Sequence, residues 1–180
     1  MDLLCSTSLS SALTPMPELY LIRHGIAANW EDYPKDKDRP LTEKGRQKTQ
    51  KMAQSLLQRK VRFDCIFTSP FLRALQTAEI LAEVGLSREI EPLSLLTPGV
   101  KLGDWQKWWK ECRYNKKGSS LSLVGHEPDL GNLSEQLLWG RVTGKIRLKK
   151  AGIVGIVIPE AEALSQNTEL FLLVSPRWMC

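Results

Sequence analysis

Three short apolar runs constrain the fold of this 180-residue chain more than any other feature. They are Leu19–Ile22, Phe63–Phe67 and Leu121–Val124. Each is hydrophobic at almost every position, which is typical of strands buried on both faces of a parallel sheet. Two further runs near the C-terminus, Ile153–Ile158 and Leu170–Val174, are also candidate strands.

Segments with helical periodicity separate these runs. Thr42 is a suitable N-cap, and Ser69-Pro70 combines a cap with proline at the first helical position. Helices are expected over about 42–59, 69–84 and 102–113, and from Pro128 onward. Alternating strands and helices predict one α/β domain over residues 16–180, a three-layer sandwich with a mostly parallel central sheet flanked by helices.

The bulk composition is that of an ordinary globular protein. No apolar run is long enough to span a bilayer, and no nucleic-acid motif accompanies the net charge of +5, so we expect neither a membrane nor a nucleic acid as partner. The four cysteines are scattered without a C-x-x-C pair, which predicts no metal site and a reducing, cytoplasmic location. Residues 1–15 are rich in Ser, Thr and Leu and make a poor secretory signal. We expect either a disordered tail or a start codon placed too early, with Met16 as the true start.

Each of the three best candidate strands ends in a polar turn. The turns are Arg23-His24-Gly25, Thr68-Ser69-Pro70 with Arg73 one helical turn later, and Gly125-His126-Glu127. In open α/β sheets, ligands bind in the crevice beyond the carboxyl ends of the strands. The sequence therefore predicts that two arginines and the only two histidines of the chain meet in one pocket.

These residue types are suited to a phosphoryl group. Arginine offers a planar fork of donors that matches phosphate oxygens. A histidine can attack phosphorus through a neutral ring nitrogen, provided that its other nitrogen carries the proton, and a nearby backbone carbonyl could fix that tautomer. Gly25 has no Cβ, which would let the backbone approach the phosphate, and Arg73 lies in the first turn of its helix, where free N–H groups favour an anion.

The three motifs resemble those of the histidine phosphatase superfamily, which has the phosphoglycerate mutase-like fold. The resemblance extends from Met16 over nearly the whole remaining chain and includes the run from Thr68 to Thr77. The stretch from Asp36 to Gly45, with Arg39-Pro40-Leu41-Thr42 inside it, resembles the SixA-type phosphohistidine phosphatases. So does the short length, because larger members insert helical segments.

The resemblance implies a phosphohistidine phosphatase in which His24 is the nucleophile and Arg23, Arg73 and His126 hold the phosphoryl group. Substrate-binding residues would be Gly25, Ser69 and Gly125. The implied substrate is a phosphohistidine on a protein, such as a histidine phosphotransfer domain, and we expect a monomer that needs no cofactor. Two alternatives remain open: a phosphatase of small phosphate esters, and a non-catalytic phosphate-binding module.

One feature of the family has no clear counterpart. Many members carry a glutamate that donates a proton to the leaving oxygen, whereas residues 93–109 contain only Asp104 as a carboxylate. Asp36 and Glu127 are further candidates, although for each of the three the favoured interpretation is a surface or cap residue. A missing acid favours P–N cleavage, because free imidazole is protonated at a pH of about 6.5 and needs less help than an alkoxide.

Two other features remain ambiguous from sequence. Trp105, Trp108 and Trp109 form a helical stripe that is expected to be core but could be a docking face for a protein substrate. The densest basic stretch is expected to be solvated and could also steer an acidic partner; it contains Arg141, Lys145, Arg147, Lys149 and Lys150.

Overall fold

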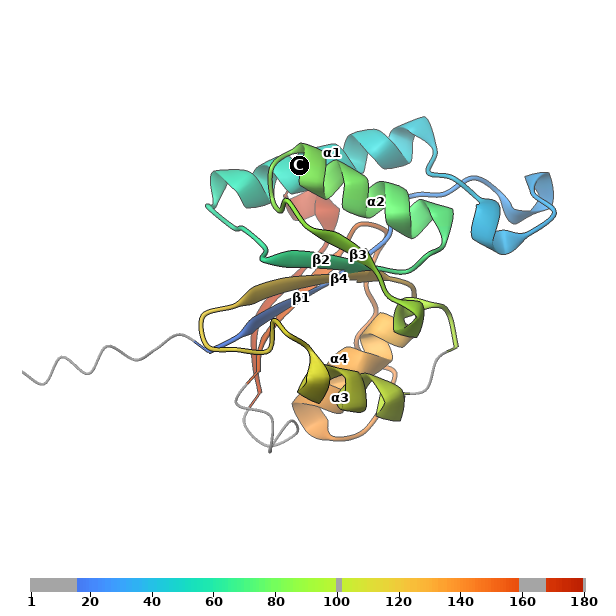
Figure 1. The fold of residues 1–180 in the computed structure, drawn as a ribbon. Coiled ribbons are helices and arrows are strands. Elements are labelled where there is room, and N and C mark those ends of the chain that lie inside the picture. Colours follow the sequence, from blue (N-terminus) through green and yellow to red (C-terminus); the bar gives the residue numbers. More distant parts are fainter. Residues whose placement is uncertain (1–15, 100–101, 159–167, 180) are drawn as a thin grey trace, which may run out of the picture.

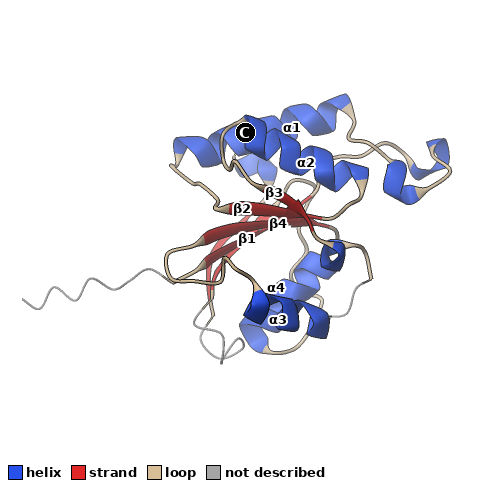
Figure 2. Cartoon of the chain, in the orientation of Figure 1, coloured by secondary structure: helices blue, strands red, loops and turns tan. Residues whose placement is uncertain are grey.

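The computed structural model describes residues 16–99, 102–158 and 168–179, so the expectation for residues 1–15 lies outside the described chain. It consists of one six-stranded sheet with two helices on each face (Figures 1 and 2). The strands are β1 Glu18–Arg23, β2 Cys65–Thr68, β3 Ile90–Pro92, β4 Ser120–Gly125, β5 Ile153–Val157 and β6 Glu169–Val174. The helices are α1 Glu43–Gln58, α2 Leu72–Glu83, α3 Leu102–Glu111 and α4 Asp129–Trp139. Four short 3₁₀ turns complete the order: η1 Trp30–Asp32, η2 Asp36–Asp38, η3 Ser94–Leu96 and η4 Pro176–Trp178.

The strand order is β3-β2-β4-β1-β5-β6. Strands β3, β2, β4 and β1 pair in parallel, whereas β5 is antiparallel to β1 and β6 is antiparallel to β5. This confirms the predicted sandwich with a mostly parallel sheet. The sequence pattern missed β3 because its three residues end in proline and none of them is buried, so no apolar run marks them.

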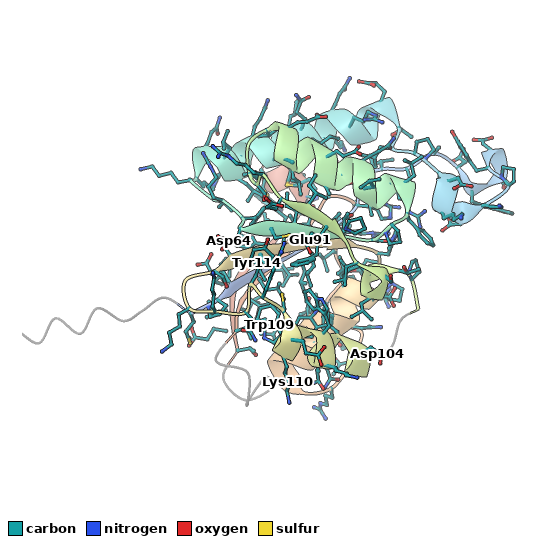
Figure 3. The ribbon with its side chains drawn as sticks, viewed as in Figure 1. Asp64, Glu91, Asp104, Trp109, Lys110 and Tyr114 are labelled. Carbon is teal, nitrogen blue, oxygen red and sulfur yellow. The ribbon has the colours of Figure 1, made fainter. Side chains whose placement is uncertain are left out.

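Alternate residues of the central strands serve two different cores. Leu19 and Leu21 face α3 and α4, whereas Tyr20 and Ile22 face α1 and α2. Trp105 and Trp109 belong to the first core, with exposures of 3% and 0%, and Trp109 lies between α3 and the sheet (Figure 3). The tryptophan stripe is therefore core, as the helical spacing indicated.

The helix starts agree with the sequence at α1 and differ at α2. Thr42 caps α1 as expected, and its Oγ1 accepts a hydrogen bond from Gly45 N at 3.0 Å. The predicted start of α2 at Ser69-Pro70 is wrong, because the helix begins at Leu72 with Phe71 at the N-cap. The hydroxyl of Ser69 instead lies 2.9 Å from His126 Nε2. Within the described ranges, no helix has both the length and the apolar character needed to cross a membrane.

Candidate active site

Strand register brings the two histidines together. Arg23 is paired with Gly125 across β1 and β4, so the residues that follow them, His24 and His126, leave the sheet side by side. The backbone N–H of His24 donates to Gly125 O at 3.0 Å, and the two imidazole centroids are 5.0 Å apart. Residues separated by about a hundred positions thus share one edge of the sheet, as the strand-end argument predicts.

His24 is held in one tautomer. Its ring is 3% exposed, and Nδ1 lies 2.7 Å from Gly25 O. Because a carbonyl oxygen can only accept, Nδ1 carries the proton and Nε2 presents a lone pair. Arg73 Nε donates to that lone pair at 3.2 Å. Burial, followed by the positive charge of Lys150 and by His126 and Arg73, lowers the pKa of His24 to about 2, so the ring is neutral at physiological pH.

Arg73 is fixed by an acidic clamp. It is 4% exposed and donates from Nη1 to Asp36 O at 2.7 Å and from Nη2 to Asp36 Oδ2 at 2.9 Å. The other oxygen of Asp36 pairs with Arg39 Nη2 at 2.7 Å. Partial burial raises the pKa of Asp36, but the hydrogen bond and charge of Arg73, together with Arg39, bring it below its ordinary value. Asp36 is therefore a carboxylate that orients arginine, and the geometry gives it no proton to donate.

His126 is a second neutral imidazole. Burial and then the charge of Arg73 lower its pKa to about 3. Its Nε2 meets Ser69 Oγ, and that hydroxyl oxygen already accepts from Phe71 N at 3.3 Å. The hydroxyl hydrogen can donate to Nε2, and in that arrangement the ring proton of His126 is on Nδ1. Nδ1 is buried and has no hydrogen-bond partner among the described residues, which suits it to donate to an anion.

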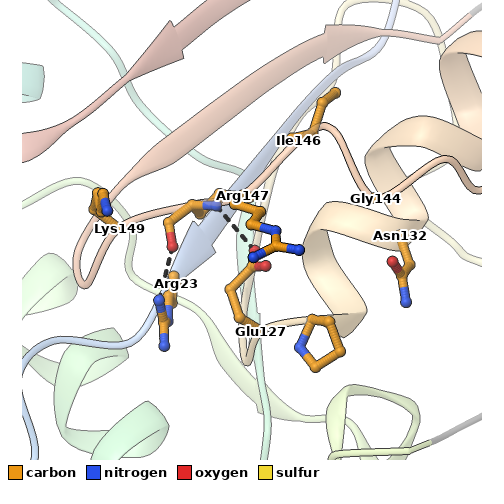
Figure 4. Close-up of a pocket in the computed structure, with 9 residues that line it drawn as sticks. Arg23, Glu127, Asn132, Gly144, Ile146, Arg147 and Lys149 are labelled. Carbon is orange, nitrogen blue, oxygen red and sulfur yellow. Dashed lines mark hydrogen bonds between the residues drawn. The ribbon is translucent and has the colours of Figure 1, made fainter.

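Arg23 and Glu127 meet at the segment before β5 (Figure 4). Arg23 Nη1 donates to Leu148 O at 2.8 Å, and Leu148 N donates to Glu127 Oε1 at 3.1 Å. Burial raises the pKa of Glu127. Both side chains thus anchor the segment that lines a hollow with Asn132, Gly144, Ile146, Arg147 and Lys149. The Nε of Arg23 is buried without a partner among the described residues.

The structure gives a different reason for glycine at position 25 from the one expected from the sequence. A Cβ there would lie 2.5 Å from Thr49 Oγ1 and 3.1 Å from Leu41 Cδ2, so glycine is required by packing against α1. Its backbone N–H donates to Thr77 Oγ1 at 3.0 Å. Gly125 likewise packs closely on Leu130, and its carbonyl holds His24. These glycines position the histidines. The space that a side chain would take is occupied by Thr49 and Leu41 at Gly25 and by Leu130 at Gly125.

Asp104, the third acid candidate, is exposed on α3 (Figure 3). Over residues 16–99, 102–158 and 168–179, no three His, Cys, Asp or Glu side chains are grouped so that they could hold a metal ion.

Sequence reasoning missed three residues that shape this site. Arg39 lies in the stretch from Asp36 to Gly45, but the sequence pattern does not indicate that it pairs with Asp36. Gln76 Oε1 accepts from Leu41 N at 2.7 Å and so holds the segment that follows the Asp36 clamp. Lys150 acts electrostatically on both histidines. The sequence places Lys150 in a basic stretch that is expected to be solvated. It reaches the site because β5 is antiparallel to β1 and therefore starts where β1 ends.

Comparisons with known proteins identify relatives of the chain. Residues 19–127 match the sequence model described as histidine phosphatase superfamily (branch 1). An uncharacterised protein of Picosynechococcus sp. is 44% identical over 90% of this chain and 98% of its own length. The phosphohistidine phosphatase SixA of Escherichia coli is 33% identical over 68% of this chain and 75% of its own. A structure of the protein histidine phosphatase SixA complexed with tungstate superposes with a TM-score of 0.79 at 28% identity, covering 91% of this chain and 99% of that one.

Proposed function

This chain belongs to the histidine phosphatase superfamily, and we propose that it is a phosphohistidine phosphatase that forms a phosphoryl intermediate on His24. The observation that carries the proposal is the tautomer of His24. Nδ1–H is held by the Gly25 carbonyl, and the lone pair of Nε2 faces the guanidinium of Arg73. A non-catalytic phosphate-binding module would not need a neutral imidazole with a fixed lone pair.

The first step is transfer of the phosphoryl group to His24. Nε2 attacks phosphorus, the bond from phosphorus to the substrate imidazole breaks, and that imidazole takes up a proton from solvent. Arg73 Nε turns from Nε2 to a phosphoryl oxygen, while Arg23 and His126 Nδ1–H donate to the others. In the second step water attacks phosphorus, the bond to Nε2 breaks, and inorganic phosphate leaves with the water oxygen. His24 returns to its neutral state, and the proton of the water passes to solvent or to phosphate.

The protonation of the carboxylates favours a phosphohistidine over an ester. An ester releases an alkoxide that demands a proton donor, whereas an imidazole is protonated near neutral pH. Asp36 is ion-paired with two arginines, and Glu127 accepts a backbone hydrogen bond. Asp36 is thus a poor acid for an alkoxide, which leaves Glu127, whose pKa burial raises, as the remaining candidate; phosphatase activity on small esters is the weaker candidate.

The proposed partner is a phosphorylated protein, such as a histidine phosphotransfer domain, in the cytoplasm. The identity to the phosphohistidine phosphatase SixA of Escherichia coli supports phosphohistidine as the group that is hydrolysed. The reaction as written uses no cofactor or metal ion.

The experiment compares substrates and traps the intermediate. Phosphate release from a phosphohistidine-bearing phosphotransfer domain should exceed release from phosphoserine and from sugar phosphates. Intact-mass analysis after a rapid, acid-free quench should find one phosphoryl group on the chain, and none on the His24→Gln variant. Arg73→Ala should lower the rate on the order of 10²–10³-fold, the usual loss of an oxyanion donor. Arg88→Ala, an exposed arginine beyond the end of α2, should not.

Faster turnover of an ester would shift the assignment to a small-molecule phosphatase. Turnover of phosphohistidine by the His24→Gln variant would remove the proposed intermediate.

A further inference from the structure

Lys150 is pinned to the active site by the backbone around it. The N–H of Ala151 lies 3.1 Å from Arg23 O and 3.2 Å from His24 O, and Arg23 N donates to Gly152 O at 3.0 Å. Gly152 N closes the turn on Lys149 O at 2.7 Å. The carbonyl of Leu148 meanwhile accepts from the Arg23 side chain. The residue between these contacts cannot leave the vicinity of His24 without breaking them.

The side chain of Lys150 is partly buried among groups of the site. It has no hydrogen-bond or ion-pair partner among the residues that the structure describes. Lys149, the preceding residue, is exposed. The charged and titratable groups that act on Lys150, or on which it acts, come from β1, η2, α2 and the turns after β1, η2 and β4; they are Arg23, His24, Asp36, Arg39, Arg73 and His126.

We propose that Lys150 is a further phosphoryl-binding residue, whose ammonium group pairs with the phosphoryl oxygens beside Arg23 and Arg73. This inference rests on the proposed function, because it concerns the same phosphoryl group. Within the described part of the chain, no acidic side chain pairs with Lys150, and Asp36 is already shared by two arginines. A dianion is therefore the partner that this cation lacks.

The free site is unfavourable for an ammonium group. Burial, then the charges of Arg23, Arg73 and Arg39, lower the pKa of Lys150 to about 8, while Asp36 acts in the opposite direction. A bound dianion raises that pKa again, because opposite charges stabilise the protonated form. Lys150 is therefore an ammonium ion when the phosphoryl group is present, which suits it to be a ligand and makes it a poor proton donor.

The chain offers a direct binding experiment because it has only two histidines, and both lie in the site. Titrating sulfate, a tetrahedral dianion whose charge is constant from pH 6 to 10, into protein with isotope-labelled histidine gives the Kd from the imidazole NMR shifts. No turnover is needed, so the result is separate from the proposed function. The variants are Lys150→Met, Lys150→Arg and, as the control of equal charge, Lys110→Met, which replaces an exposed lysine of α3.

In the wild-type protein, the sulfate Kd should rise above a pH of about 8, towards tenfold per pH unit, as Lys150 loses its proton. Lys150→Met should weaken binding at pH 7 about tenfold or more, which corresponds to about 1.4 kcal/mol, and should abolish the dependence above pH 8. Lys150→Arg should keep the affinity without that dependence, since arginine stays charged. Lys110→Met should bind as the wild type does.

Unchanged sulfate affinity in Lys150→Met, or a pH dependence that survives in both Lys150 variants, would overturn the proposal. Should Lys150→Met fail to show the native histidine spectrum, the Lys150→Arg titration decides alone. A phosphohistidine assay that fails while these titrations succeed would overturn only the proposed function.

Discussion

At the scale of single residues, the site depends on imidazoles that stay neutral in a cationic environment. His24 and His126 are each 3% exposed, and Arg73 lowers the pKa of both, though burial is the larger cause. Neutrality of His24 is what a nucleophile needs, and it has a consequence for stability. The unfolded chain binds a proton on each histidine at a pH of about 6.5, whereas the folded chain does not.

The stability that the two neutral histidines contribute should therefore be fully present above pH 6.5. The free energy of unfolding should fall as the pH drops below that value. Each histidine contributes up to about 1.4 kcal/mol per pH unit in this range. Between pH 6.5 and 5, wild-type protein should lose about 3 kcal/mol more than the His24→Gln/His126→Gln double variant. Urea unfolding in a buffer free of phosphate and sulfate measures the difference, and carboxylate effects cancel between the two proteins. Parallel pH profiles would mean that the folded histidines titrate normally.

A second prediction at this scale separates the two roles considered for Asp36. If the carboxylate orients Arg73, Asp36→Asn should lower kcat/KM for phosphohistidine about tenfold and affect an ester substrate by a similar factor. Asp38→Asn is the matched control, because Asp38 lies on the same 3₁₀ turn and is exposed. A loss confined to ester substrates would instead identify Asp36 as the proton donor.

At the scale of elements, the contact between the β1 end and α1 decides where His24 stands. Gly25 is the point of closest approach, with Thr49 Oγ1 in the space of a Cβ, and its carbonyl also fixes the His24 tautomer. From the sequence alone, we expect Gly25 to let the backbone approach the phosphate. A glycine beside a nucleophile suggests room for phosphate. The structure shows instead that helix α1 fills the space that a Cβ would need.

Gly25→Ala should destabilise the fold by about 1–3 kcal/mol, the usual cost of overpacking. Thr49→Ala removes the clashing hydroxyl, which bonds only within its own helix to Gly45 O, so the double variant should regain much of that loss. Thermal unfolding of the four proteins gives the coupling energy. Strictly additive effects would show that Gly25 serves the ligand and not the packing.

Other elements show where sequence patterns succeed. The buried strands β1, β2 and β4 are legible because both faces are covered, so their residues are continuously apolar. The sequence predicts the wrong start of α2 because a serine in this position can cap a helix or bond to a histidine. The two roles look identical in sequence. The four principal site residues follow from strand-end motifs. Lys150 does not, because its approach depends on strand order.

At the scale of the whole molecule, the site gathers more positive than negative charge. Arg23, Arg39 and Arg73 all act on Lys150 there, and the acids among them are Asp36 and Glu127. The chain as a whole carries a formal net charge of +5. A dianionic phosphoryl group is therefore attracted before it makes contact.

The kcat/KM for a phosphohistidine protein should fall about tenfold between 20 and 300 mM salt, since a Debye length of about 8 Å at 150 mM screens the approach. The kcat should change much less, because the bound phosphoryl group is enclosed. Steady-state kinetics at several salt concentrations tests this, and an uncharged osmolyte at equal osmolality should have no effect. A salt-independent kcat/KM would exclude steering by the site.

The direction of β5 has one further consequence, for how a domain of this fold can diversify. Ile22, near the end of β1, is paired with Ile153 at the start of β5, so this strand enters the sheet where β1 and β4 leave it. The loop from α4 into β5 thus reaches the reaction centre without a crossover helix. Insertions in its exposed first part, residues 140–142, would add contacts beside the centre while Leu148 and Lys150 stay in place and every βα connection keeps its length. For protein engineering, the exposed part of this loop is therefore the segment of the domain that is best suited to exchange.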